Sequence, residues 1–367
     1  MKKKILILSN NASGLYDFRN ELLLELLKTY EVHVSLPDGR EIPQLEEEGC
    51  ILHHTKLDRR GINPIKDLGL IFAYIKLIRR IDPGVVLTYT IKPNIYGGLC
   101  CRILKIPYLT NITGLGSAFE HNGIVKKIVI FLYQQALKKA SCVFFQNKKN
   151  QQLFEDYKVK GKKSALLPGS GVNLLRHRKE EYPPKEEKIR LIFVGRMMRE
   201  KGMDELLYTI EKICTEDSGV IFEIVGNYEE DYEKSVERLV EKGYLILNGY
   251  QKEIHPYYKK CHGIIMPSYH EGMNNVILEA SATGRPVLAS NIPGCREGFT
   301  EGITGYGFAP RDKEELYKVV KKFLLLSYEE KREMGKRARE KMEREFDRNL
   351  VVKKYREEIH DILERQS

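Results

Sequence analysis

The chain has 367 residues, of which 42% are apolar and 31% are charged. This composition is typical of a globular protein, and it excludes a largely disordered one. The length suits two domains of about 180 residues each. The longest apolar runs are far shorter than the roughly 20 residues that a membrane-spanning helix needs. A basic head and a short apolar run begin the chain, and we interpret them as a first β-strand and not as a signal peptide. We therefore expect a cytoplasmic protein.

The seven cysteines indicate neither a disulfide framework nor a zinc site. Their number is odd, no Cys-x-x-Cys motif occurs, and most of them lie in apolar runs. We expect reduced, buried thiols and no bound metal.

The net charge of +10 is distributed unevenly along the chain. Residues 1–180 carry a net charge of +13, whereas residues 181–367 carry −3. Such a one-sided field favours an anionic partner, which could be a phospholipid surface, a lipid diphosphate or a nucleic acid. The basic residues are scattered over several predicted elements and match no known motif for nucleic acids, so we do not expect a nucleic-acid partner.

Short β-rich runs alternate with helical patterns throughout the first half. The runs are continuously apolar, which is typical of parallel strands that helices cover on both faces. We expect strands at residues 4–9, 32–36, 50–54, 85–89, 108–112 and 142–146. Helices are expected at residues 17–29, 64–81, 94–104, 123–139 and 148–156. This order predicts a doubly wound parallel sheet.

The pattern pauses at residues 173–188, a polar stretch with a Pro-Pro pair that we interpret as a linker. It resumes with strands expected at residues 189–194, 220–225, 244–247, 263–266 and 286–289, and with helices at 203–214, 230–242 and 274–283. We thus predict an α/β protein with two Rossmann-like domains, residues 1–172 and 189–348, facing each other across a ligand-binding cleft. The final segment, 349–367, is either a helix that crosses back to the first domain or a free solvated helix.

Strand 189–194 runs directly into a loop that carries two cations. Gly195 ends the strand and permits the close approach of a ligand, and Arg196 and Lys201 follow before the next helix. A forked guanidinium and an ammonium suit a diphosphate. The alternative is a basic loop that only caps the helix.

The segment between strand 263–266 and helix 274–283 carries the strongest functional pattern. Gly272 lies in the connecting turn, and the N–H groups at the start of the helix predict an anion site. Glu271 precedes the helix, and Glu279 lies about two turns inside it. A nucleotide sugar requires such an arrangement, with one carboxylate near a sugar, another near a ribose, and phosphates between them. The apolar neighbours of Glu279 indicate a buried helix, in which an idle carboxylate would be costly.

Taken together, these motifs resemble the retaining glycosyltransferases of family 4, which have the GT-B fold. The resemblance rests on the order and spacing of Gly195-Arg196…Lys201-Gly202, Glu271-x7-Glu279, Gly284-Arg-Pro-Val-Leu-Ala-Ser290, Gly294…Glu297 and Gly302-x-x-Gly305. In the first half, residues 13–19 and 111–119 resemble the subgroup that makes bacterial capsule, O-antigen and related lipid-linked glycans.

The resemblance implies a role for each matching position. Arg196 and Lys201 would hold the donor diphosphate, Glu271 would contact the donor sugar, and Glu279 would contact the ribose. The remaining donor-binding positions are Gly195, Gly272, Met273, Asn274, Asn275 and Val276 around the diphosphate, Tyr250 and Gln251 beside the nucleobase, and Gly14 in the first β-α turn.

The N-terminal domain departs from the family pattern at one position. Many members have a His after the strand equivalent to residues 108–112, close to the transferred sugar, and this chain has Thr113 there. His121 is either a substitute from a loop or a surface residue. Arg19 is a third candidate for contact with the acceptor or the sugar.

The reaction that the resemblance implies is transfer of a hexose or N-acetylhexosamine from a UDP-sugar, with retention, to a polyprenyl-diphosphate-linked saccharide. No Asp-x-Asp pair occurs in the sequence, which agrees with cationic side chains in place of a divalent metal. We expect no cofactor besides the donor substrate. Two alternatives stay open: a UDP-sugar 2-epimerase of the same fold, and a glycosyltransferase that acts on a soluble acceptor.

Helix 123–139 has basic pairs on both sides of an apolar centre, and residues 75–80 add a second cationic, apolar stretch. One interpretation is that this face rests on the anionic inner surface of the cytoplasmic membrane, where the protein would be peripheral. The other interpretation is a core helix with lysines at its ends.

Overall fold

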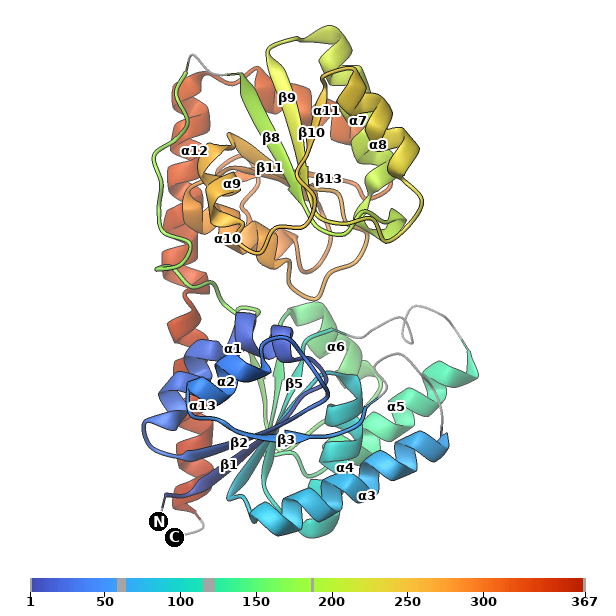
Figure 1. Ribbon diagram of the computed structural model, residues 1–367, viewed down its shortest axis with the longest axis vertical. Helices are drawn as coiled ribbons and strands as arrows, with labels where there is room; N and C mark the ends of the chain where they lie inside the picture. The colour runs from blue at the N-terminus through green and yellow to red at the C-terminus, as the bar shows by residue number, and fades with distance from the viewer. Residues whose placement is uncertain (1, 58–63, 115–122, 186–187, 366–367) are drawn as a thin grey trace. The chain divides into compact units, whose positions relative to one another are not determined.

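The computed structural model describes residues 2–57, 64–114, 123–185 and 188–365, which form two compact units (Figure 1). Unit 1 comprises Met1–Ser170 and Arg348–Ser367, and unit 2 comprises Gly171–Asp347. The predicted linker therefore belongs to unit 2. It is anchored there by two contacts: the main-chain amide of Glu180 donates to the carbonyl of Thr283 at 3.1 Å, and the side-chain hydroxyl of Tyr182 donates to the carbonyl of His262.

Within the described residues, unit 1 contains a seven-stranded sheet of parallel strands in the order β3-β2-β1-β4-β5-β6-β7. The strands are β1 (Lys4–Leu8), β2 (Glu31–Leu36), β3 (Ile51–His54), β4 (Val85–Tyr89), β5 (Tyr108–Ile112), β6 (Cys142–Phe145) and β7 (Ser164–Leu166). The helices are α1 (Ala12–Leu27), α2 (Ile42–Glu47), α3 (Pro64–Ile81), the π-helix η1 (Pro93–Gly97), α4 (Gly98–Leu104), α5 (Ile124–Leu137), α6 (Lys148–Asp156) and α13 (Arg348–Glu364). None of the described helices combines the length and the apolar character needed to cross a membrane.

The alternation of side chains along each strand divides the core of unit 1 into two layers. In β1, Ile5 and Ile7 face a layer that includes α1 and α13, whereas Leu6 and Leu8 face a layer that includes α3, α4 and α5. Because both faces are covered, the strands are apolar throughout, which explains the continuous runs in the sequence.

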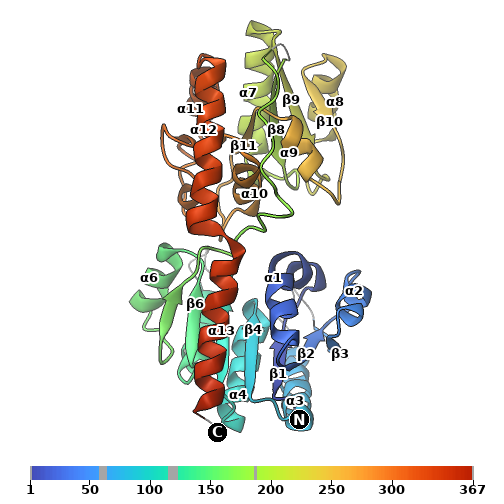
Figure 2. The ribbon, with the colours of Figure 1, turned by 90° about the vertical axis from the view of Figure 1, so that its left-hand side faces the viewer.

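The C-terminal helix α13 packs on α1 and β4 and so belongs to unit 1 (Figure 2). Two polar contacts, the first partly buried and the second buried, fix its position. Arg348 Nη1 lies 2.8 Å from Glu21 on α1, and the side-chain amide of Asn111 on β5 donates to the hydroxyl of Tyr355 at 2.6 Å.

Unit 2 repeats the architecture, with a six-stranded parallel sheet in the order β10-β9-β8-β11-β12-β13 among its described residues. Its strands are β8 (Ile189–Val194), β9 (Val220–Val225), β10 (Leu245–Leu247), β11 (Gly263–Met266), β12 (Val287–Ser290) and β13 (Gly305–Phe308). Its helices are η3 (Arg199–Lys201), α7 (Met203–Glu216), α8 (Glu233–Glu241), α9 (His255–Lys260), α10 (Asn275–Thr283), η4 (Arg296–Gly298), α11 (Lys313–Leu324), α12 (Tyr328–Lys341) and η5 (Met342–Phe346). The predicted α/β class with two doubly wound sheets is confirmed.

All seven cysteines lie in the described part of the chain, where each is buried and none forms a disulfide. Burial raises the pKa of the Cys50 and Cys142 thiols to about 12, so both stay protonated at neutral pH. The expectation of buried thiols is confirmed.

The Asn111–Tyr355 contact predicts a measurable effect on stability. Replacing Tyr355 with Phe removes the acceptor of a buried amide and leaves that amide without its partner, which costs about 1–3 kcal/mol. We expect the Tyr355→Phe variant to lose this much unfolding free energy in urea titrations followed by circular dichroism. Tyr30→Phe, at a partly buried ring packed on the same core, is the control. Equal stability of the two variants would contradict this account of α13 docking.

Candidate functional site in unit 2

Two loops of unit 2 are held together by the close approach of their main chains. Gly202 follows η3 with a φ of +74°, and a Cβ atom on it would lie 2.2 Å from the carbonyl oxygen of Pro267. The Tyr269 hydroxyl donates to the carboxylate of Glu205 on α7 at 2.8 Å. These contacts fix the loop after β11 against the loop after β8.

Helix α10 begins at this junction. The side chain of Asn274 caps the helix by accepting a hydrogen bond from the amide of Ile277 at 3.1 Å. The main-chain amide of Asn274 donates to the carbonyl of Gly294 at 2.7 Å. Among the described residues, the amides of Asn275 and Val276 have no acceptor, and the side-chain oxygen of Asn275 is buried without a partner. Unpaired amides at a helix start form an anion site.

Lys201 and Glu271 lie beside this helix start. The Lys201 ammonium is 2.6 Å from Glu271 Oε1, and the same oxygen accepts from Asn274 Nδ2 at 3.1 Å. Both charged side chains are largely buried, with 22% and 14% of their surface exposed. Burial raises the pKa of the Cys295 thiol well above its usual range, and the Glu271 carboxylate raises it further. The structure thus brings together three of the predicted residues: Lys201, Glu271 and Asn274.

Gly294 allows this cluster to form. Its φ is +88°, and a Cβ atom there would lie 2.6 Å from the carbonyl oxygen of Glu271. The Gly294 amide donates to Glu297 at 2.6 Å, which closes the turn after β12. The Gly294…Glu297 motif therefore supports the main chain that carries Glu271.

Arg196 is placed differently. It follows Gly195 at the carboxyl end of β8, its side chain is half-exposed, and Nη1 lies 3.1 Å from Glu229. A guanidinium has five N–H donors, so this ion pair leaves capacity for a phosphate oxygen.

Glu279 lies on α10 and is partly buried, as the sequence indicates. The buried hydroxyl of Tyr258 on α9 donates to Glu279 Oε2 at 3.0 Å. The two predicted nucleobase neighbours follow β10. Tyr250 is 64% exposed, and Gln251 donates to the carbonyl of Asn248 at 2.8 Å.

The unit 1 candidates do not form a cluster. Helix α1 begins at Ala12, so Gly14 lies in the first helical turn and not in the predicted β-α turn. Arg19 is buried, with its guanidinium 5.5 Å from the Tyr89 ring, so it does not present its charge at the surface. Thr113 is partly exposed directly after β5, and His121 lies outside the described residues.

Sequence reasoning missed two residues of this region, Tyr269 and Tyr258. Tyr269 lies inside the segment with the strongest functional pattern, so its position in that segment could have indicated it. Tyr258 lies in α9, a helix of six residues that the apolar pattern did not predict. In the described residues, no group of three or more His, Cys, Asp or Glu side chains is placed to hold a metal ion.

The sequence matches two family profiles that between them cover most of the chain. Residues 4–147 match the family described as Glycosyl transferase 4-like, and residues 176–341 match Glycosyl transferases group 1. The chain belongs to the family-4-like glycosyltransferases of the GT-B fold. It is therefore a sugar-transferring enzyme, as the five motifs predicted.

Individual proteins are similar in sequence to this chain over long stretches. An N,N'-diacetylbacillosaminyl-diphospho-undecaprenol alpha-1,3-N-acetylgalactosaminyltransferase from Campylobacter jejuni is 24% identical, covering 96% of this chain and 97% of that protein. A UDP-Gal:alpha-D-GlcNAc-diphosphoundecaprenol alpha-1,3-galactosyltransferase from Escherichia coli is 27% identical, covering 64% and 65%. The crystal structure of Anabaena HepE in complex with UDP-glucose has a TM-score of 0.80 at 16% identity, covering 98% of this chain and 99% of that one, and shows the shared fold.

The close approach at Gly294 predicts that even a methyl group is damaging there. Gly294→Ala combines a strained φ with a clash against the Glu271 main chain. Gly302 has a similar φ of +69°, but no atom lies within 4 Å of an added Cβ. Gly302→Ala should therefore lose only the unfolding free energy that the left-handed backbone costs, about 1–2 kcal/mol. We expect a lower melting temperature for Gly294→Ala than for Gly302→Ala in differential scanning calorimetry. The opposite order would show that the turn is not tightly packed.

Proposed function

We propose that this glycosyltransferase moves a hexose or N-acetylhexosamine from a UDP-sugar, with retention and without a metal, to a polyprenyl-diphosphate-linked saccharide in bacterial surface glycan synthesis. The observation that carries the proposal is the start of α10, where unpaired amides lie beside Lys201 and Glu271. The names of the Campylobacter and Escherichia relatives, which both specify diphosphoundecaprenol-linked acceptors, support the acceptor class.

The diphosphate of the donor would bind at the start of α10. The amides of Asn275 and Val276 and the positive end of the helix dipole favour phosphate oxygens there. Lys201 has three N–H donors, so it can bind a phosphate oxygen while it keeps its contact with Glu271. Glu271 would meet the hydroxyls of the donor sugar, and Glu279 would meet the ribose.

Breaking the glycosyl–phosphate bond leaves negative charge on the departing diphosphate and positive character at the anomeric carbon. Catalysis requires that the site bind this charge distribution more tightly than the ground state. Lys201, Arg196 and the α10 amides supply fixed positive charge for the leaving group, which would make a divalent cation unnecessary. Retention would follow from attack on the same face, with a donor phosphate oxygen accepting the proton of the acceptor hydroxyl.

One face of unit 1 suits an anionic membrane surface that carries the acceptor. Helices α3, α4 and α5 lie side by side on this face (Figure 1). Large apolar side chains are exposed along it, at Leu68, Phe72, Ile124, Ile128 and Phe131. Exposed lysines and arginines lie on the same helices, and each basic residue near an anionic surface contributes about 1 kcal/mol. This combination is typical of peripheral membrane binding.

The donor site is tested by removing its cations one at a time. Lys201→Ala and Arg196→Ala should each lower kcat by about 10²–10³-fold, because the leaving group loses a preorganised charge. The assay is transfer from a panel of UDP-sugars to a synthetic lipid-diphosphate-linked sugar, with and without EDTA. Arg238→Ala is the matched control, because it breaks an exposed ion pair between Arg238 on α8 and Glu211 on α7. Its kcat should equal that of the wild type.

Three results would contradict the proposal. Wild-type turnover that EDTA abolishes would contradict the metal-independent mechanism. Conversion of the UDP-sugar in the absence of acceptor would instead support a 2-epimerase. Transfer to water-soluble sugars alone would support a soluble acceptor.

Membrane binding is tested by flotation with vesicles that contain phosphatidylglycerol. We expect the wild type to float at low salt and less at high salt, because salt screens the attraction between the basic residues and the anionic lipid. Phe131→Ser on α5 should lower the bound fraction several-fold. Leu325→Ser replaces a side chain that is 84% exposed in unit 2 and serves as the control. Failure of the wild type to float at low salt would rule out this surface.

A further inference from the structure

The carboxylate of Glu279 is held by a helix that is itself anchored at both ends. This helix, α9, packs against α10. The Tyr258 side chain, with 0% exposure, reaches from α9 to Glu279 Oε2. Burial raises the pKa of Tyr258 well above its usual range, and Glu279 raises it further, so the phenol stays protonated and donates.

The C-terminal end of α9 is bound by Arg285. This arginine is completely buried, and its Nε donates to the carbonyl of Tyr258 at 2.7 Å while Nη2 donates to the carbonyl of Lys259 at 2.9 Å. Its other hydrogen bonds are also with main-chain carbonyls, including that of Glu181 at 2.7 Å. A cation at a helix C-terminus satisfies carbonyls that lack helical partners.

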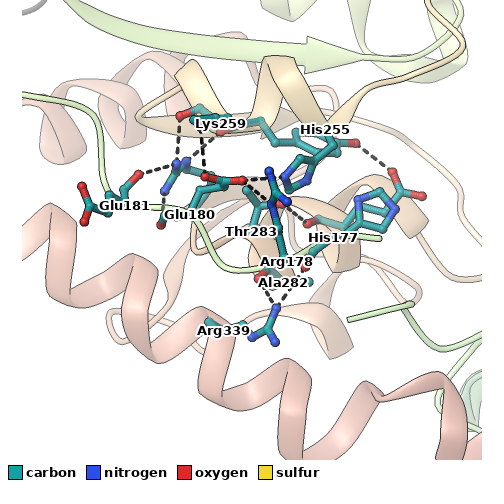
Figure 3. A network of polar contacts seen from close by, with 12 residues as sticks. His177, Arg178, Glu180, Glu181, His255, Lys259, Ala282, Thr283 and Arg339 are labelled. Carbon is teal, nitrogen blue, oxygen red and sulfur yellow. Dashed lines mark hydrogen bonds and ion pairs between the residues drawn. The ribbon is translucent and has the colours of Figure 1, made fainter. Parts of the chain in front are cut away.

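The N-terminal end of α9 is bound by the segment that precedes β8 (Figure 3). His255 Nε2 lies 3.0 Å from Glu180, and Lys259 and Arg178 contact the same carboxylate. The hydrogen bond from His255, followed by that from Arg178, lowers the pKa of Glu180 to about 2. Glu180 is therefore ionised at neutral pH. Helix α9 cannot shift along α10 without breaking the contacts of His255 and Lys259 with this carboxylate.

We propose that Tyr258, held in place by Arg285, is a positioning residue that orients Glu279 and so gives the enzyme its preference for ribonucleotide over deoxyribonucleotide donors. The inference rests on the proposed function, in which Glu279 meets the ribose. A carboxylate has about four lone-pair positions, so it can accept from Tyr258 and still accept from sugar hydroxyls. The phenol fixes one oxygen and thereby fixes the direction in which the carboxylate can receive those hydroxyls.

The test compares the affinities of UDP and 2'-deoxy-UDP by isothermal titration calorimetry. We expect the wild type to prefer UDP by roughly 10–100-fold, the value of one hydrogen bond to a charged group. Tyr258→Phe should reduce this ratio about 5–10-fold and raise KM for the donor, with kcat at saturating donor close to that of the wild type. Tyr257→Phe, on the same helix and only partly buried, should keep the full ratio.

A second variant tests the same contact from the other side. Glu279→Asp keeps the charge but moves the carboxylate away from the Tyr258 phenol, so it should also lower the ratio of the affinities for UDP and 2'-deoxy-UDP. Adding Tyr258→Phe to Glu279→Asp should then cause no further loss of that ratio. An unchanged ratio in Tyr258→Phe would overturn the inference while leaving the proposed function intact. An unchanged ratio in Glu279→Asp would overturn the inference and also remove the proposed contact between Glu279 and the ribose. A wild type that turns over UDP-sugars but binds both nucleotides equally would also overturn it. Absence of any nucleotide binding by the wild type would refute the proposed function itself.

Discussion

The contact of main chain with main chain at two glycines is the constraint on which the candidate site depends. Gly202 packs on the carbonyl of Pro267, and Gly294 packs on that of Glu271, at separations that leave no room for a side chain. Because these loops touch, the Lys201 ammonium reaches Glu271 beside the start of α10, which Asn274 caps. A residue other than glycine at either position would separate the charges from the helix start.

The charged side chains at this junction contribute more to the positioning of the Lys201 ammonium than to the stability of the fold. A largely buried ion pair recovers little more than its own desolvation cost, so the Lys201–Glu271 pair is weak support for the fold. Its value lies in holding an ammonium beside unpaired amides before any substrate arrives. In the proposed reaction, such preorganised charge would need little rearrangement when the diphosphate departs, and it would therefore stabilise the leaving group.

The two units differ in how their charged and apolar side chains are arranged. Unit 2 holds its polar groups in a tightly bonded cluster, and Arg285 and Glu180 extend that order to helix α9. Unit 1 carries the basic excess of the sequence, buries Arg19 within its fold, and exposes apolar side chains on α3 and α5. In the proposed function, unit 2 would bind the small, highly charged donor, and unit 1 would meet the extended anionic surface.

Patterns that are local in the sequence predicted most of the fold and much of the site. The parallel strands follow from apolar runs, the start of α10 follows from its turn and its capping residue, and the glycine motifs follow from the conformations that only glycine adopts readily. The contacts of Tyr258 with Glu279, of Arg196 with Glu229, and of Arg285 with the carbonyls of Glu180 and Glu181 were not predictable. The sequence left open whether the final helix packs on the first domain, and it did not indicate that the predicted linker belongs to unit 2. Each of these joins residues that are far apart along the chain, and their meeting depends on how whole helices and sheets pack, which no short stretch of sequence encodes.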